Sequence, residues 1–96
     1  MRSEPVAHAT ILLACAEKTI TEARDAWRRA RASPDLDSLR SALRLCILAA
    51  RFSHRAAEAW AQEPTRANRL TVDAKNLEAA VADIKLRLAA VYAHAS

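Results

Sequence analysis

The sequence predicts an all-α protein: an elongated antiparallel three-helix bundle whose helices run up, down and up, with coiled-coil-like heptad seams. Three observations support this prediction. The 96 residues include no Gly, the residue that supplies the positive φ angles of hairpins and bulges. Ala and Leu, both strong helix formers, account for 24 and 11 residues. Apolar residues also recur at alternating spacings of three and four, which is the period of a helical seam.

Domain organisation follows from the length of the chain and from its prolines. A chain of 96 residues has room for one hydrophobic core, so we expect a single helical domain over residues 1–96. Pro34 and Pro64 interrupt the apolar spacing. Turns of only a few residues between the segments favour antiparallel neighbours. The expected helices span residues of about 5–32, 34–62 and 65–93.

The first expected helix alternates large apolar residues with alanines. Large residues recur every seven positions, and an Ala follows each of them by three. Alanine in every second layer allows the backbone of a neighbouring helix to approach closely. The segment therefore predicts tight packing along one side. The seam consists of Val6, Ala9, Leu13, Ala16, Ile20, Ala23, Trp27 and Ala30.

The second expected helix has a start signal and a complete seam. Ser33 offers an N-cap oxygen, Pro34 suits the first helical position, and Asp35 places an acid in the first turn. Apolar residues also lie outside the seam, so this helix should be the most buried one or should face a second partner. Its seam consists of Leu36, Leu39, Leu43, Cys46, Ala50, Ser53, Ala57 and Trp60.

The third expected helix begins after the break at residues 63–65. It repeats the alternating spacing over its whole length, which predicts that it packs beside the second helix in the reverse direction. The seam consists of Ala67, Leu70, Ala74, Leu77, Val81, Ile84, Leu88 and Val91.

Four apolar residues outside the seams predict a protein interface. Their side chains would form an exposed strip, and such strips usually mark contacts with other proteins. We therefore expect self-association or incorporation into a larger complex. The predicted interface residues are Leu45, Leu48, Phe52 and Leu86.

The charge of the chain favours acidic partners. Lys and Arg number 15 against 11 Asp and Glu, which gives a net charge of +4. On the second helix, Arg40, Arg44, Arg51 and Arg55 fall within about 60° of one another over about 22 Å. Such a row is suited to the phosphates of a nucleic-acid backbone. The alternative is a solvated surface in which the arginines pair with acids such as Asp37 and Glu58.

One end of the predicted bundle carries the net positive charge. The up-down-up order brings together the C-terminal halves of the first and third helices and the N-terminal half of the second. We expect the first helix to add Arg24, Arg28, Arg29 and Arg31 to the nucleic-acid contacts. A patch of this kind attracts nucleic acid but reads no base sequence.

These patterns predict a non-catalytic helical subunit of a larger assembly that contacts a nucleic-acid backbone. In size, charge and helicity the chain is similar in kind to the small subunits of CRISPR effector complexes, which line the path of the bound strands. That resemblance implies that Arg40, Arg44, Arg51 and Arg55 contact phosphates. The alternative function is a homo-oligomeric adaptor or inhibitor that binds protein and no nucleic acid.

Catalytic and ligand-binding signatures are not evident. The lack of Gly excludes phosphate-binding loops and dinucleotide fingerprints, and no Cys/His pair has zinc spacing. We expect no enzyme activity, no cofactor, no metal and no small-molecule substrate. Arg87 and His94 resemble the loose Arg and His signature of HEPN ribonucleases, and this resemblance implies RNA cleavage as a third reading.

The aromatic residues, the cysteines and the N-terminus allow further expectations. Trp27 and Trp60 occupy seam positions and should lie in the core. Tyr92 lies beside the seam, so the sequence leaves two possibilities open: its ring packs in the core, or it is exposed and stacks on bases. Cys15 and Cys46 are too far apart along the predicted hairpin for a disulfide. No apolar run approaches the about 18 residues of a membrane span, and we expect a cytoplasmic protein.

Overall fold

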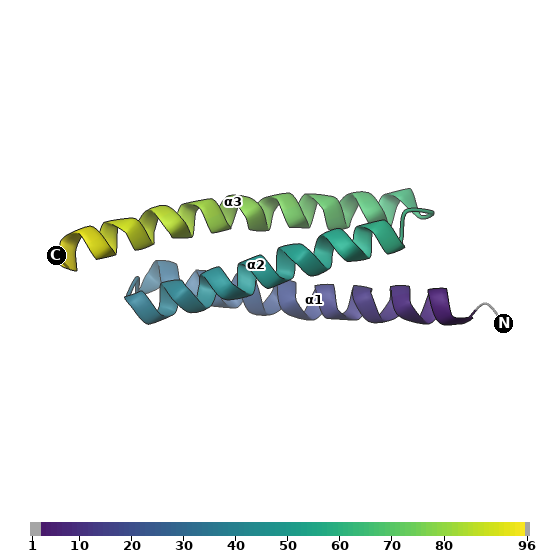
Figure 1. Cartoon of the computed structure of the whole chain (residues 1–96), viewed down its shortest axis with the longest axis horizontal. Coiled ribbons are helices and arrows are strands. Elements are labelled where there is room, and N and C mark those ends of the chain that lie inside the picture. The colour runs from purple at the N-terminus through teal and green to yellow at the C-terminus, as the bar shows by residue number, and fades with distance from the viewer. Residues whose placement is uncertain (1–2, 96) are drawn as a thin grey trace.

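The computed structural model describes the backbone of residues 3–95 and the side chains of residues 7–94. Within that range the chain forms three helices and no strand: α1 (Ser3–Ala32), α2 (Leu36–Ala59) and α3 (Pro64–Ala95). The predicted all-α helical bundle is confirmed. Figure 1 shows that the chain reverses direction at each turn, and that the N-terminus of α1 and the C-terminus of α3 lie at opposite ends of the molecule.

The central helix of the bundle is α2. Both α1 and α3 pack along α2, but they make few contacts with each other. The molecule is therefore long and narrow, with principal dimensions of 59 × 19 × 18 Å. The last turns of α3 extend beyond the end of the bundle where α2 begins (Figure 1).

The predicted start of α2 was wrong by two residues. The N-cap is Asp35 and not Ser33, and α2 begins at Leu36. The Asp35 carboxylate accepts a hydrogen bond from the Ser38 backbone N–H at 2.8 Å and another from the Ser38 hydroxyl at 3.0 Å. A charged acceptor at the N-cap is more strongly stabilised by the helix dipole than a serine hydroxyl. Pro34 consequently lies before the helix.

The turn between α2 and α3 is longer than the sequence predicted. Helix α2 ends at Ala59 and not at residue 62, because residues 60–63 form a hydrogen-bonded turn in which the Glu63 N–H donates to the Trp60 carbonyl at 2.9 Å. Helix α3 starts at Pro64, one residue earlier than expected, and continues to Ala95. Proline is favoured at the first helical position because the backbone N–H that it lacks would have no hydrogen-bond partner within the helix there.

The buried residues follow the predicted apolar spacing. Each seam residue with a described side chain is buried or half-buried, whereas the side chain of Val6 lies outside the described residues. In α1 three of the alanines are the most deeply buried members, since Ala16, Ala23 and Ala30 are 0% exposed. Helix α2 also buries a second row that the seam did not include. This row consists of Ala42, Ala49 and Ala56.

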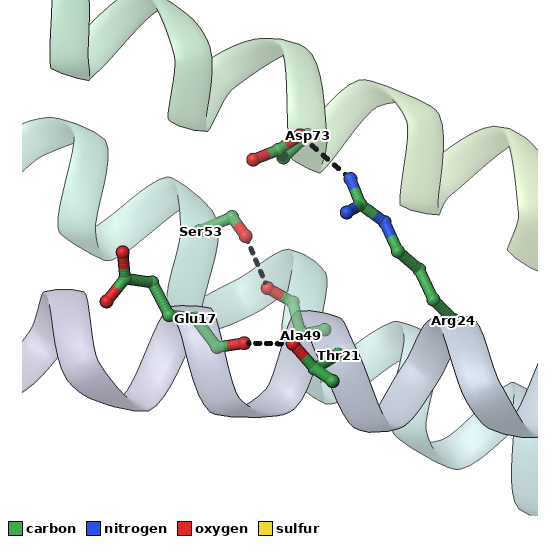
Figure 2. Close-up of polar contacts among 6 residues, drawn as sticks. All are labelled: Glu17, Thr21, Arg24, Ala49, Ser53 and Asp73. Carbon is green, nitrogen blue, oxygen red and sulfur yellow. Dashed lines mark hydrogen bonds and ion pairs between the residues drawn. The ribbon is translucent and has the colours of Figure 1, made fainter.

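Polar groups in the core are satisfied within their own helices. The buried Ser53 hydroxyl donates to the Ala49 carbonyl at 2.8 Å (Figure 2), and the buried Thr19 hydroxyl donates to the Cys15 carbonyl at 2.7 Å. Cys15 and Cys46 are both free, as predicted. Cys15 is half-buried, whereas Cys46 is buried and its burial raises the pKa of its thiol. In the part of the chain that is described, no helix is long and apolar enough to cross a membrane.

Enlarging a buried alanine of α1 should destabilise the bundle. Ala16 is 0% exposed, whereas Ala14, two residues earlier, is exposed. We expect Ala16→Leu to lower the free energy of unfolding by about 1–3 kcal/mol, because a larger side chain must displace packed neighbours. Urea unfolding monitored by circular dichroism measures this change. Ala14→Leu is the matched control and should alter the free energy by less than about 0.5 kcal/mol. Equal effects of the two substitutions would contradict the packing.

The Asp35 cap should make stability depend on pH. Its hydrogen bonds with Ser38 hold the pKa of the Asp35 carboxyl below its ordinary value. The cap therefore stabilises the fold fully at pH values above the ordinary pKa of the carboxyl, and this stabilisation is lost as the pH falls through the lowered pKa of the folded state. We expect Asp35→Ala to lower the melting temperature at neutral pH, and the gap from the wild type to narrow in acid below about pH 4. Asp37→Ala is the control from the same turn. A gap that stays constant with pH would argue against a capping role.

Candidate nucleic-acid interface

A row of arginines lies along the outer surface of α2. Arg40, Arg44, Arg51 and Arg55 are all exposed, and the helical geometry places them on one side of α2 over about 22 Å. The core residues Leu39, Cys46 and Ser53 lie on other sides of the helix. We refer to these four arginines as the arginine row. Helices α1 and α3 pack against other sides of α2.

Most of the arginine row has no acidic partner. Within residues 7–94, the guanidinium groups of Arg44, Arg51 and Arg55 form no ion pair. The carboxylates of Asp37 and Glu58, which were the expected neutralising partners, form none there either. The row is therefore a concentrated strip of positive charge with donors that face solvent.

The fourth member of the row is tied to α3. An Arg40 guanidinium N–H donates to the Tyr92 hydroxyl at 2.6 Å, so the end of the row where α2 begins is attached to the C-terminal part of α3. Arg40 forms no ion pair with a described carboxylate either, so its positive charge is also uncompensated.

The predicted basic end of the bundle is partly neutralised. Arg24 on α1 pairs with Asp73 on α3 at 3.3 Å, across the space between these helices (Figure 2). Arg28 pairs with Asp25 at 2.9 Å. By contrast, Arg29 is exposed and forms no ion pair within the described side chains. The sequence located these arginines at one end but did not reveal which acids face them.

Two further arginines at this end lie against the ring of Trp27. The guanidinium carbons of Arg31 on α1 and Arg87 on α3 lie 5.2 and 5.1 Å from the centre of the Trp27 ring. Both distances are within the range of cation–π attraction. Arg87 also pairs with Asp83 at 3.1 Å. Arg31 forms no ion pair with a described carboxylate, so it is the second uncompensated cation that α1 offers here.

The residues of the predicted protein interface differ in their exposure. Leu45 and Phe52 are half-buried and pack against the core, whereas Leu48 is 41% exposed and Leu86 is 72% exposed. Sequence reasoning missed Val72, which is 55% exposed and lies two heptads before Leu86 on α3. The seven-residue spacing of 72, 79 and 86 is the signal that would have found it.

The aromatic side chains also divide by exposure. Trp27 and Trp60 are half-buried against the core, as their seam positions predicted. The Trp60 indole N–H donates to the Ala9 carbonyl at 2.9 Å, and the Arg66 guanidinium lies 4.5 Å from the centre of the ring. The ring of Tyr92, for which the sequence left two possibilities, is 49% exposed.

A groove runs between α1 and α3 because these helices make few contacts with each other. It has a volume of about 880 Å³. The floor includes the buried side chains of Ile20 and Leu70, and the rims carry charged residues of both signs, among them Glu17 and Arg69. The Arg24–Asp73 pair contributes to the lining of this groove. The apolar residues of its floor are almost fully buried, and the charges on its rims are of both signs.

Arg87 and His94, which resemble a ribonuclease signature, have different surroundings. Arg87 is bound to Asp83 and lies against Trp27, while His94 is exposed near the end of α3. Among the described residues, no three His, Cys, Asp or Glu side chains are placed so that they could hold a metal ion.

Comparisons with known proteins add no further assignment. A scan against protein-family models finds none that matches the chain, and searches of curated proteins and of solved structures find no match either.

Proposed function

We propose that this chain is a non-catalytic helical subunit that binds the backbone of a nucleic acid through the arginine row on α2. The observation that carries the proposal is the state of Arg44, Arg51 and Arg55. Their side chains are exposed, lie on one side of α2, and form no ion pair with any described carboxylate.

The chemistry of arginine favours phosphate as the ligand of this row. The planar guanidinium donates two parallel hydrogen bonds to phosphate oxygens. Each phosphate that the row neutralises releases condensed counterions, so binding becomes weaker as salt is raised. Contacts of this kind carry no sequence information. The proposed binding is therefore tight at low salt and independent of base sequence.

The proposal includes membership in a larger assembly. Leu86 and Val72 present exposed apolar surface on α3, away from the arginine row on α2, so protein contacts and backbone contacts need not compete. The combination of a small basic helical chain, a phosphate-binding row and separate apolar contacts is similar in kind to the small subunits of CRISPR effector complexes. Under this proposal the bound strand lies along α2.

Charge reversal in the arginine row should weaken nucleic-acid binding. We expect Arg44→Glu combined with Arg51→Glu to lower affinity at least roughly tenfold at low salt, because two phosphate contacts are replaced by repulsion. The slope of log affinity against log salt should fall by about 1.4 to 1.8, the contribution of two phosphates. Fluorescence anisotropy with a labelled oligonucleotide at several salt concentrations measures both quantities.

A matched control separates the row from net charge. Lys18→Glu combined with Lys75→Glu changes the charge of the chain by the same amount on the exposed surfaces of α1 and α3. This variant should retain most of the affinity and the salt slope. If the two double variants bind alike, net charge and not the arginine row accounts for binding. Unchanged binding by the row variant would overturn the proposal.

The second candidate is a homo-oligomeric interaction protein without nucleic-acid binding. It is favoured by the exposure of Leu86, which is 72%, because apolar residues this exposed often mark protein contacts when they cluster. Leu86 is a better probe than Phe52, since Phe52 packs against the core and its replacement would also destabilise the fold.

Substitution of Leu86 tests this second candidate. We expect Leu86→Gln to reduce the mass of an oligomer measured by light scattering after size-exclusion chromatography, and to leave the melting temperature unchanged. Ala14→Gln, on the exposed surface of α1, should leave the mass as it is. A monomeric wild type, or an oligomer that Leu86→Gln does not alter, would count against an interface at this position.

A further inference from the structure

We infer that Tyr92 is a stacking platform for an unpaired base, and that the ligand of the arginine row is therefore a single-stranded nucleic acid. This inference rests on the proposed function and specifies its ligand. The observation behind it is that an exposed aromatic ring is hydrogen-bonded to the first arginine of the row. Arg40 donates to the Tyr92 hydroxyl at 2.6 Å, and the Tyr92 side chain is 49% exposed.

Arg40 reaches the Tyr92 ring from its hydroxyl end. Its guanidinium carbon lies 5.9 Å from the centre of the ring. The guanidinium of Arg66, by comparison, lies 4.5 Å from the centre of the Trp60 ring, which is the distance expected when the two groups stack. Because Arg40 binds the hydroxyl at 2.6 Å, it does not occupy the position above the ring that a base would take.

The hydrogen bond also fixes the ring relative to the row. A tyrosine side chain has few rotatable bonds, and a hydrogen bond at its tip restrains them further, so little conformational entropy is lost when a base stacks on it. Arg40 and Arg44 are separated by about 6 Å along the axis of α2, and Arg51 and Arg55 are separated by the same distance. A strand whose phosphates follow the row towards the start of α2 therefore reaches Tyr92, which contacts Arg40 there.

Tyr92 is the exposed aromatic side chain among the residues that the structure describes. Trp27 is half-buried and has two arginines against its ring. Trp60 is half-buried, donates to the Ala9 carbonyl and is covered by Arg66. Phe52 is half-buried against the core. Stacking on any of these three rings would require rearrangement of the bundle, whereas stacking on Tyr92 would not.

A stacking residue beside a basic row favours single strands over duplexes. In a duplex each base is already stacked and paired, and extracting one costs a few kcal/mol. In a single strand the bases are free to stack on a protein ring, and this stacking combined with backbone contacts is the usual mode of single-strand binding. The last turns of α3 extend past the start of α2 (Figure 1), and the Tyr92 side chain in this part of α3 is 49% exposed.

The experiment compares three labelled ligands of the same length by fluorescence anisotropy: an oligothymidylate, an abasic single strand and a duplex. At equal salt the wild type should bind the oligothymidylate more tightly than the other two. Tyr92→Leu should lose roughly fivefold or more of its affinity for the oligothymidylate, which corresponds to one lost stacking contact. Its affinity for the abasic strand should be unchanged, so that the two single strands become equivalent ligands.

Tyr92→Phe is the control that keeps the ring and removes the hydroxyl. It should retain most of the preference for the oligothymidylate over the abasic strand. If Tyr92→Leu loses this preference and Tyr92→Phe keeps it, the loss comes from the missing ring and not from the missing Arg40 contact. Melting curves should show that both variants remain folded, since the side chain is half exposed.

The outcomes separate this inference from the proposed function. If the Arg44 and Arg51 reversal weakens binding but Tyr92→Leu does not alter the preference for bases, stacking at Tyr92 is overturned and the arginine row stands. If the reversal changes binding to none of the three ligands, the proposed function fails. A wild type that binds the duplex as tightly as the oligothymidylate would also overturn the assignment to single strands.

Discussion

The packing of two helices against α2 is the constraint on which the other features of this protein depend. To contact α1 and α3 at once, α2 must bury most of its circumference, and it does so with a seam of larger residues and a second row formed by Ala42, Ala49 and Ala56. Small side chains allow the helices to approach closely. The remaining side of α2 faces solvent, and the arginine row lies there beside other exposed residues such as Asp37 and Glu58. The same arrangement keeps α1 and α3 apart and opens the groove between them.

The three helices and their buried residues could be predicted because a seam repeats its signal at every turn. Each seam contains eight residues in a fixed spacing, so an error at one position does not change the outcome. Helix ends lack this redundancy. Ser33 and Asp35 are both suitable N-caps, and the choice between them depends on Ser38, which donates two hydrogen bonds to the Asp35 carboxylate. The end of α2 was missed for a similar reason, since Trp60 fits the seam although it lies in the turn.

The candidate site was predictable where it lies on one helix and not where it joins two. The positions of Arg44 and Arg51 on one side of α2 follow from helical geometry alone. The pairing of Arg24 with Asp73 and the contact of Arg40 with Tyr92 connect different helices. These contacts depend on the stagger of α3 along α2, which a single sequence does not determine to within a side chain's length. The exposure of Tyr92 is a consequence of the same stagger.

The arginine row places like charges close together on one helix. Like charges four residues apart on a helix destabilise it by about 0.2–0.5 kcal/mol per pair, and the row contains two such pairs. On α1 the same spacing occurs at Arg24 and Arg28, but each of these is compensated, by Asp73 and by Asp25. On α2 no arginine of the row forms an ion pair with a described carboxylate, although Asp37 and Glu58 lie three residues from Arg40 and Arg55. Positions that break a local rule of stability without internal compensation are characteristic of functional sites. A bound phosphate backbone would supply the missing negative charge to α2, which is the helix that α1 and α3 hold in place.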